Sequence, residues 1–176
     1  MLLILYLLMS YLEFCSNCGS KNSYDFIDGN NRYHCLFCKN IHYENPKPTS
    51  TIICMKDTSL LLARRAFDPG KGEWGLPGGF MELHETLEEA TKREFLEETN
   101  LKCNFKKIIT TCSHYGTIFG DILLVGVEVN VNDFNSMRAG DDVSELQFFD
   151  INHLPEIAFN CHTKIINDFI NSNKSN

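Results

Sequence analysis

Two closely spaced pairs of cysteines near the amino terminus constrain the fold of this chain more than any other feature. The pairs are CSNC at 15–18 and CLFC at 35–38. Two residues between the cysteines of a pair let both sulfurs bind one ion, and the gap between the pairs suits a four-thiolate zinc site. Because about 25 residues cannot bury a core, metal binding would have to supply the folding free energy. The sequence therefore predicts a zinc ribbon over residues 15–42, with the ligands Cys15, Cys18, Cys35 and Cys38.

The same cysteines admit two other interpretations, which are redox chemistry of the thiols and binding of nucleic acid by the ribbon. The charged side chains from 15 to 38 are only Lys21 and Arg32 against Asp25 and Asp28. The ribbon surface is therefore not basic, and a structural or dimerising role is favoured over nucleic-acid binding.

The chain of 176 residues is long enough for this module and one catalytic-sized domain, since domains most often contain about 100–150 residues. Its hydrophobic fraction of 43% and charged fraction of 22% are those of a folded globular protein. The formal net charge is −7, and no run of Lys and Arg is longer than two residues. We therefore expect neither nucleic acid nor an anionic membrane as a partner.

An apolar segment, MLLILYLLM, precedes the cysteines within residues 1–14. It is too short to span a bilayer, which takes about 20 residues, and it lacks the basic start and the cleavage site of a secretory signal. We interpret it as a mis-assigned start upstream of Met9 or as a short element that packs on the body. A signal remnant or an interfacial anchor is the alternative. No transmembrane segment follows it, so we expect a cytoplasmic protein.

Proline content and patterning indicate a second domain after the ribbon. The stretch YENPKPTS at 43–50 contains two prolines and is predicted to be a linker. Apolar runs at 51–56 and 59–65 meet at the turn-forming Asp57-Thr58-Ser59 and predict a hairpin. A loop rich in Gly and Pro follows at 66–79.

The rest of the chain alternates a helix with strands. A helix is predicted from about Thr86, and a final amphipathic helix at 162–170. Between them, strand-like runs occupy 105–115, 121–131 and 145–150. This order predicts an α/β (α+β) sandwich, a mixed sheet between helices, over residues 51–171. The polar residues 172–176 are expected to be disordered.

The central helix carries carboxylates on its apolar side. At about 100° per residue, Leu87, Thr91 and Phe95 share one stripe, and Glu94 and Glu98 fall on either side of Leu87's direction. Desolvated carboxylates repel one another, so a divalent cation would resolve the conflict.

The alternative is a solvated acidic surface, supported by the favourable i,i+4 order of Glu89 and Arg93. Against it, the glycines of PGGF just before the helix let the backbone approach a ligand closely. Carboxylate ligands favour Mg²⁺ or Mn²⁺, which also bind diphosphate oxygens.

These residues resemble the signature of the Nudix hydrolases, Gly-x5-Glu-x7-Arg-Glu-apolar-x-Glu-Glu-x-Gly-apolar. Eight of its nine specified positions match, and Asn100 stands where the pattern has Gly. Asn also tolerates a left-handed helix cap. The matching residues are Gly79, Glu85, Arg93, Glu94, Phe95, Glu97, Glu98 and Leu101. The cysteine ribbon, IHYENPKP and the late SELQFFDINHLPEIAF extend the resemblance to zinc-ribbon members similar to ADP-ribose and FAD pyrophosphatases.

The resemblance implies that Glu94, Glu97 and Glu98, with the Gly79 carbonyl, hold Mg²⁺ or Mn²⁺ against a diphosphate. It also implies that Arg93 and Glu85 pair to hold the loop on the helix. Glu97 and Glu145 are the alternatives for the general base. Candidate substrate contacts, each with an ordinary structural role as the alternative, are Arg64, Arg65, Phe80 and Glu82. Trp74 is expected to pack in the core, with stacking on adenine as the alternative.

The activity implied is hydrolysis of a nucleoside diphosphate linked to another group, giving two phosphomonoesters. ADP-ribose and FAD are favoured. NADH is less favoured because TTCSHYGTIFGD stands where NADH pyrophosphatases carry a Ser-Gln-Pro-Trp-type stretch. An RNA-cap substrate and a non-catalytic nucleotide sensor are the remaining alternatives. The same resemblance also allows a homodimer.

Overall fold

The computed structural model describes residues 12–174 and divides the chain into two compact units, Met1–Asn45 and Pro46–Asn176. The prediction for the apolar segment MLLILYLLM lies outside the described residues. No helix among the described residues is long and apolar enough to cross a membrane.

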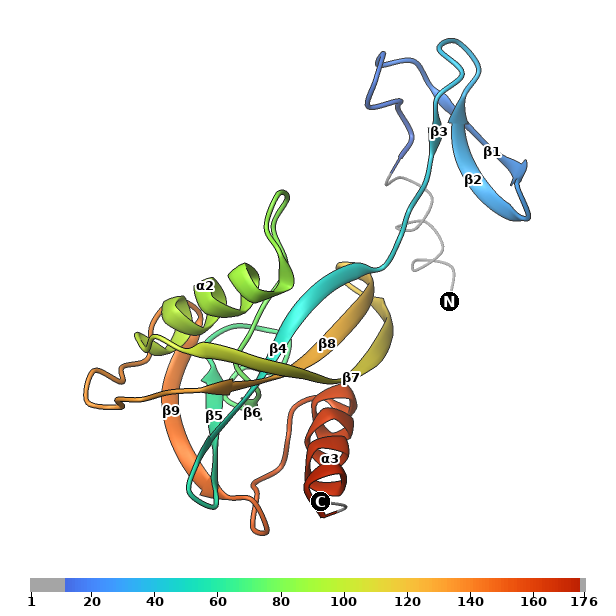
Figure 1. The fold of residues 1–176 in the computed structure, drawn as a ribbon. Helices are drawn as coiled ribbons and strands as arrows, with labels where there is room; N and C mark the ends of the chain where they lie inside the picture. Colours follow the sequence, from blue (N-terminus) through green and yellow to red (C-terminus); the bar gives the residue numbers. More distant parts are fainter. Residues whose placement is uncertain (1–11, 175–176) are drawn as a thin grey trace. The chain divides into compact units, whose positions relative to one another are not determined.

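The first unit is a three-stranded antiparallel sheet (Figure 1). Its strands are β1 (Asn22–Ile27), β2 (Asn30–Cys35) and β3 (Ile41–His42). Asp28 and Gly29, with φ of 49° and 82°, connect β1 to β2, as an Asp-Gly pair does in a two-residue hairpin turn. Each cysteine pair forms a tight knuckle, closed by hydrogen bonds from the Gly19 N–H to the Cys15 carbonyl and from the Lys39 N–H to the Cys35 carbonyl.

The second unit is built on a six-stranded mixed sheet in the order β6-β5-β4-β8-β7, with β9 paired to β5. The strands are β4 (Lys47–Lys56), β5 (Ser59–Arg65), β6 (Trp74–Gly75), β7 (Asn104–Thr117), β8 (Gly120–Asn130) and β9 (Val143–Asp150). The β4–β8 pair is parallel, and the other pairs are antiparallel. The predicted hairpin, the later strands and the mixed sheet are therefore confirmed.

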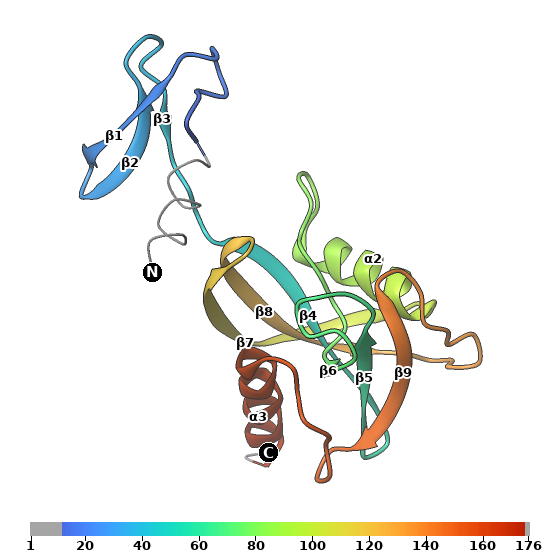
Figure 2. The same ribbon diagram turned by 180° about the vertical axis from the view of Figure 1, so that it is seen from behind.

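Two helices cover this sheet, α2 (Leu87–Thr99) and α3 (Asn160–Lys174). They lie on opposite sides of β4, β7 and β8 in both views (Figures 1 and 2). Each helix contributes to its own hydrophobic cluster, α2 through Phe95 and α3 through Ile165, Ile166 and Phe169. A buried hydrogen bond of 2.8 Å between the hydroxyls of Ser50 on β4 and Thr91 also joins α2 to the sheet. The second unit thus has a core that needs no ion.

Two segments differ from expectation. Residues 47–50, assigned to a linker from the two prolines, are the first part of β4 and pair with β8. Pro48 is compatible with this strand because its missing N–H costs one bond, while its carbonyl accepts from the Met81 N–H at 3.0 Å. Residues 172–174, expected to be disordered, continue α3 as far as Lys174.

Candidate active site

Capping interactions hold both ends of α2. The Thr86 hydroxyl accepts a hydrogen bond from the Glu89 N–H, and the Glu89 carboxylate accepts one from the Thr86 N–H. At the other end Asn100 is left-handed, with φ of 57°, and donates its N–H to the Leu96 carbonyl at 2.8 Å. Asn100 therefore closes the helix in the way expected of the glycine that it replaces.

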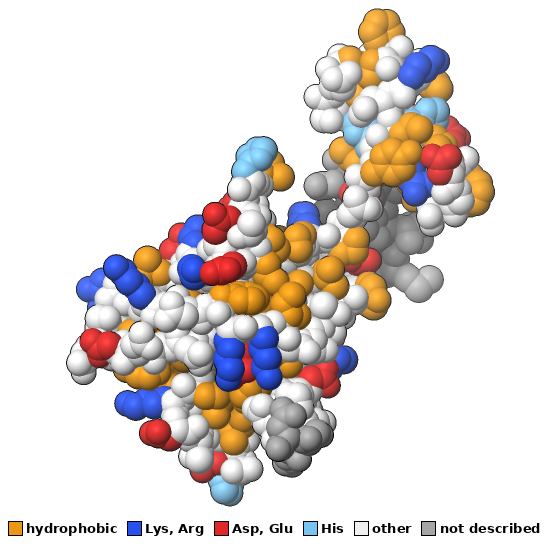
Figure 3. All heavy atoms as spheres, in the orientation of Figure 1, with side chains coloured by type: hydrophobic (Ala, Val, Ile, Leu, Met, Phe, Trp, Pro, Cys, Tyr) orange, Lys and Arg blue, Asp and Glu red, His pale blue; other side chains and the backbone are white. Residues whose placement is uncertain are grey.

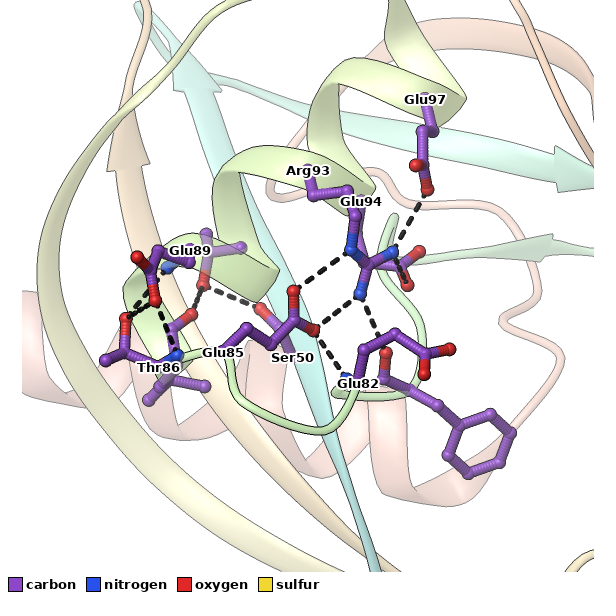
Figure 4. A network of polar contacts seen from close by, with 11 residues as sticks. Ser50, Glu82, Glu85, Thr86, Glu89, Arg93, Glu94 and Glu97 are labelled. Carbon is purple, nitrogen blue, oxygen red and sulfur yellow. Dashed lines mark hydrogen bonds and ion pairs between the residues drawn. The ribbon is translucent and has the colours of Figure 1, made fainter.

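Arg93 is the centre of a network that fastens the preceding loop to α2 (Figure 4). Its guanidinium donates two hydrogen bonds to Glu85, of 2.6 and 3.1 Å, and one of 3.1 Å to the Phe80 carbonyl. It also donates to Glu94 at 2.7 Å and to Glu97 at 3.1 Å. The bonds from Arg93 hold the pKa of Glu85 below its ordinary value, so Glu85 stays ionised.

Gly78 and Gly79 let this loop touch both the sheet and the helix. Gly78 has a φ of 131°, and a Cβ there would lie 2.0 Å from the Ser50 carbonyl oxygen. A Cβ on Gly79 would lie 2.4 Å from a carboxylate oxygen of Glu94. The Gly79 carbonyl accepts from the Ser50 N–H at 2.9 Å, which leaves its second lone pair for another partner. Only glycine fits at 78 without backbone strain.

Two of the three helix glutamates are sheltered from water. Glu98 is 7% exposed and accepts a hydrogen bond of 2.9 Å from the Gly78 N–H. Burial raises the pKa of Glu98 to about 8, and the charges of Asp142 and Glu94 add to this. Burial also raises the pKa of Glu94. Glu97 is different, since its side chain is 45% exposed and pairs with Arg93.

These features fit a hard divalent cation. The donors are carboxylate oxygens, which Mg²⁺ and Mn²⁺ prefer. A cation beside Glu94 and Glu98 would offset the desolvation and repulsion that raise their pKa values. Within residues 12–174, however, the three helix carboxylates do not converge to within 4.8 Å of one another, as the cysteine sulfurs do.

A cavity of about 520 Å³ opens beside this helix and loop. Its walls come from β4, β5, the glycine loop, β7, β8 and the start of α3. Residues that line it near α2 and the loop include Arg65, Gly78, Gly79, Phe80, Glu98 and Asp142. A cavity of this volume accommodates a nucleotide-sized ligand.

The structure separates the predicted substrate residues into two groups. Arg65 and Phe80 line the cavity. Arg64 does not, because successive side chains of a strand point to opposite faces, and its guanidinium pairs with Glu145 at 3.2 Å. Glu145 is held in that exposed ion pair on the β5–β9 pair, outside the residues that line the cavity.

Two other candidates also lie away from the cavity wall. Trp74 packs edge-on against Phe149, with ring centroids 4.9 Å apart, which agrees with the expected core role. The exposed Glu82 contributes its N–H to a hydrogen bond with Glu85. Neither residue is among those that line the cavity.

Asp142 is a carboxylate that the sequence did not single out. It lines the cavity, and its charge contributes to the raised pKa values of both Glu94 and Glu98. Gly140 brings it there, because the Gly140 N–H donates to the Glu98 carbonyl at 3.1 Å and a Cβ would lie 2.6 Å from the Glu97 carbonyl oxygen. The only signal in the sequence was an acidic pair just after a glycine.

The four ribbon cysteines form a second, separate site. Their sulfurs lie within 4.8 Å of one another, with 3.6 Å between Cys15 and Cys38 and 3.5 Å between Cys18 and Cys35. Tetrahedral zinc with bonds of about 2.3 Å requires sulfurs about 3.8 Å apart. Hydrogen bonding by the Asn17 side chain lowers the pKa of Cys38 to about 6, which favours the thiolate. The donor set therefore fits a structural zinc ion.

The comparison with known families matches this geometry. The NUDIX domain matches residues 45–169. A crystal structure of a NUDIX hydrolase from Nitrosomonas europaea has a TM-score of 0.81 to this chain, with 28% identity and 93% of each chain covered. The chain therefore belongs to the NUDIX hydrolase family, and the resemblance carried by residues 79–101 is confirmed.

Relatives with assigned activities are also similar. The ADP-ribose pyrophosphatase of Methanocaldococcus jannaschii is 38% identical over 136 residues, which are 73% of this chain and 75% of that protein. The NAD-capped RNA hydrolase NudC of Vibrio parahaemolyticus is 27% identical over 154 residues. That match covers 84% of this chain and 54% of NudC, so the chain spans about half the length of that relative.

Proposed function

We propose that this protein hydrolyses the diphosphate bond of a nucleoside diphosphate linked to another group, in a reaction that depends on Mg²⁺ or Mn²⁺. ADP-ribose is the first candidate, with AMP and ribose 5-phosphate as products, and FAD is the second. The observation that carries the proposal is the buried Glu98, which lines a nucleotide-sized cavity, beside the half-buried Glu94, with both carboxylates against the glycine loop. The similarity to an ADP-ribose pyrophosphatase over about three quarters of both chains supports it.

In this proposal Glu94, Glu97 and Glu98, together with the Gly79 carbonyl, hold the ion. When bound, the ion would neutralise diphosphate charge and lower the pKa of a coordinated water. Arg65, which lines the same cavity, supplies a positive charge for a phosphate oxygen.

Arg93 has a positioning role. Its bonds to Glu85 and to the Phe80 carbonyl keep the glycine loop against the helix, and its bonds to Glu94 and Glu97 orient these carboxylates. Loss of such a supporting contact typically costs about 10- to 100-fold in metal affinity or activity.

For the general base we propose Asp142 in place of Glu145, with Glu97 as the alternative. Asp142 lines the cavity beside Glu98, whereas Glu145 is paired with Arg64 outside it. Glu97 does not line the cavity, and its carboxylate already accepts a hydrogen bond from Arg93. If Asp142 is the base, Asp142→Asn lowers kcat strongly and Glu145→Gln does not.

The decisive experiment measures Mg²⁺-dependent release of AMP from ADP-ribose by the wild type and by Glu98→Gln. Glu88→Gln is the matched control, because Glu88 is an exposed residue of the same helix, ion-paired with Lys92. We expect Glu98→Gln to lose about 100-fold or more in kcat, and Glu88→Gln to stay near wild type. Binding of ADP-ribose without turnover in all three proteins would instead indicate a nucleotide sensor.

NADH and NAD-capped RNA belong in the same substrate panel, because the NudC relative aligns with 84% of the chain. A long RNA is disfavoured by the net charge of −7. On the face shown in Figure 3, Lys and Arg side chains occur in small groups beside Asp and Glu rather than as a continuous basic surface. Faster cleavage of NADH than of ADP-ribose would reverse our order of preference.

We further propose that Zn²⁺ in the ribbon is structural and that the protein is a cytoplasmic homodimer. All eight cysteines are free, and residues 12–174 contain no disulfide, as is usual in a reducing compartment. The ribbon leaves several large apolar side chains exposed, among them Phe26 at 74% and Phe37 at 79%, which a dimer would cover. Analytical ultracentrifugation of wild type and Phe37→Ser tests the dimer.

A further inference from the structure

The cavity is also lined by three residues that the proposed hydrolysis does not use, Phe159, His162 and His114. Phe159 contacts the rings of His162 and His114, with centroid distances of 5.4 and 6.0 Å. The Arg65 guanidinium carbon lies 5.2 Å from the centre of the Phe159 ring. All four side chains line the cavity, next to apolar residues such as Ile122 and Leu124. This part of the wall is aromatic and apolar, in contrast to the wall at Glu98.

His162 is held in one orientation by the chain segment that leads into the glycine loop. The Leu76 N–H donates a hydrogen bond of 3.0 Å to its Nδ1 atom. A Cβ on Gly75 would lie only 3.1 Å from the same nitrogen, so the ring packs directly on the backbone there. Gly75 and Leu76 thus hold His162, while Gly78 contacts Glu98 and Gly79 contacts Glu94.

This bond also decides which nitrogen carries the proton. A nitrogen that accepts a hydrogen bond has none, so the neutral ring carries its proton on Nε2. Burial lowers the pKa of His162 to about 4, so the ring is neutral at physiological pH. The aromatic wall therefore contains one fixed N–H donor.

The two parts of the wall are close enough for one nucleotide to reach both. Leu76 and Gly79 are three residues apart, which limits their separation to about 11 Å of chain. Arg65 connects the two parts, because its charge acts on Glu98 while its guanidinium lies over Phe159.

We propose that His162, His114 and Phe159 form the subsite for the purine base of the substrate, with His162 Nε2–H donating to a ring nitrogen. A purine has flat faces that pack on aromatic rings and unprotonated ring nitrogens that accept hydrogen bonds. The inference rests on the proposed function, since it assumes that the diphosphate lies at Glu98 and Arg65. The base then extends toward the start of α3.

Binding of AMP, measured by calorimetry, tests this subsite without any bond being cleaved. In the 1-deaza, 3-deaza and 7-deaza analogues of AMP, one ring nitrogen at a time is replaced by C–H, which removes one acceptor. We expect the wild type to bind one analogue about 5- to 100-fold more weakly than AMP, because the His162 donor is left unpaired. His162→Phe should bind AMP about as weakly and should no longer distinguish that analogue.

Two further variants and one control keep the test decisive if His162→Phe folds poorly. His162→Gln offers an amide oxygen to Leu76 and an amide N–H to the base, so it should restore part of the discrimination. His114→Leu leaves the Leu76 bond intact and should weaken AMP and all three analogues equally. His153→Phe is the control, because the His153 side chain is 84% exposed and does not line the cavity, and it should behave as wild type.

The inference is wrong if the wild type binds AMP and all three deaza analogues equally, or if ribose 5-phosphate binds as tightly as AMP. It is also wrong if His162→Phe keeps the wild-type discrimination. Discrimination among the analogues without hydrolysis of any diphosphate would sink the proposed function and leave the base subsite standing. Hydrolysis of a diphosphate substrate without discrimination among the AMP analogues would support the proposed function and rule out the base subsite.

Discussion

The cysteine ribbon and the acidic helix both collect metal-binding side chains, but only the ribbon brings them to one point. Its four sulfurs lie within 4.8 Å of one another. On α2 the buried Glu98 is bonded to Gly78, while Arg93 holds Glu94 and the half-exposed Glu97. The cysteines come from two knuckles that face each other, whereas the carboxylates on α2 bond to different partners and do not meet at one point. An ion bound to the four converging sulfurs can therefore stabilise the ribbon fold. The helix carboxylates do not converge in this way, so they depend on a fold that is stable without the ion.

The burial of the two units shows the same contrast. Within residues 12–45 only Cys15 and Cys35 are buried. The second unit has two hydrophobic clusters, one under each helix. The ribbon should therefore depend on its ion for folding, and the second unit should depend on its ion for activity alone.

Removing zinc should have the largest effect. We expect a chelator to collapse the amide NMR peaks of residues 12–45 to unfolded positions, because zinc sites of this type supply roughly 10–16 kcal/mol of folding free energy. Peaks of Pro46–Asn176 should stay dispersed. Cys38→Ser should act like the chelator, whereas Cys112→Ser, outside the ribbon, should not. If the ribbon keeps its dispersed NMR peaks without metal, it does not depend on zinc for folding, and the contrast between the two units is wrong.

The two loop glycines should respond differently to alanine. Gly78→Ala places a Cβ 2.0 Å from a backbone oxygen at a φ of 131°, so we expect a loss of about 3 kcal/mol or more in the free energy of unfolding. At Gly79 the nearest atoms belong to the flexible Glu94 carboxylate. Gly79→Ala should therefore cost about 1 kcal/mol or less and lower kcat by displacing Glu94. Urea unfolding and ADP-ribose turnover measure both effects, and equal stability of the two variants would contradict the loop geometry.

Acid should weaken the second unit through His162. Its folded pKa of about 4 lies below the unfolded value of 6.5, so the unfolded state binds the proton more readily. This contribution to stability is complete above pH 6.5 and is lost as the pH falls toward 4, by roughly 2–3 kcal/mol. Urea unfolding across this range should show a shallower pH dependence for His162→Gln. An unchanged slope would mean that His162 is not held neutral.

The smallest effect is expected at the helix cap. Asn100→Gly restores the residue of the family pattern and relieves a left-handed φ of 57°, but it removes the Asn100 Nδ2–H bond to the Ser136 carbonyl. These effects oppose each other, so the unfolding free energy should change by less than about 1 kcal/mol. Turnover should be unchanged. A large loss of activity would mean that the cap positions the glutamates directly.

The sequence predicted the features that depend on local spacing. The spacing of two residues between cysteines predicted the knuckles, and the 100° rotation per helical residue placed Glu94 and Glu98 on either side of Leu87's direction. Features that depend on strand pairing were not predictable. Glu145 and Asp142 are three residues apart, and only the β5–β9 register, in which Arg64 pairs with Glu145, separates their positions.

The remaining residues of the candidate site could not be predicted from the sequence, because their positions depend on packing between distant segments. His162 could not be assigned to the cavity from the sequence, because its hydrogen-bond partner Leu76 lies 86 residues away in the chain. No local pattern connects the two residues. Asp142 depends on Gly140 packing against the backbone of α2. The extension of β4 through Pro48 similarly depends on β8, which lies far along the sequence.

The most direct test is a crystal of the protein soaked in Mn²⁺, with the ion located by its anomalous scattering. We predict a peak within bonding distance of the Glu94 and Glu98 carboxylates and the Gly79 carbonyl, and its loss in Glu98→Gln. A peak only at exposed surface carboxylates, or none in a crystal whose zinc site is filled, would contradict the assignment of α2 as the catalytic metal site.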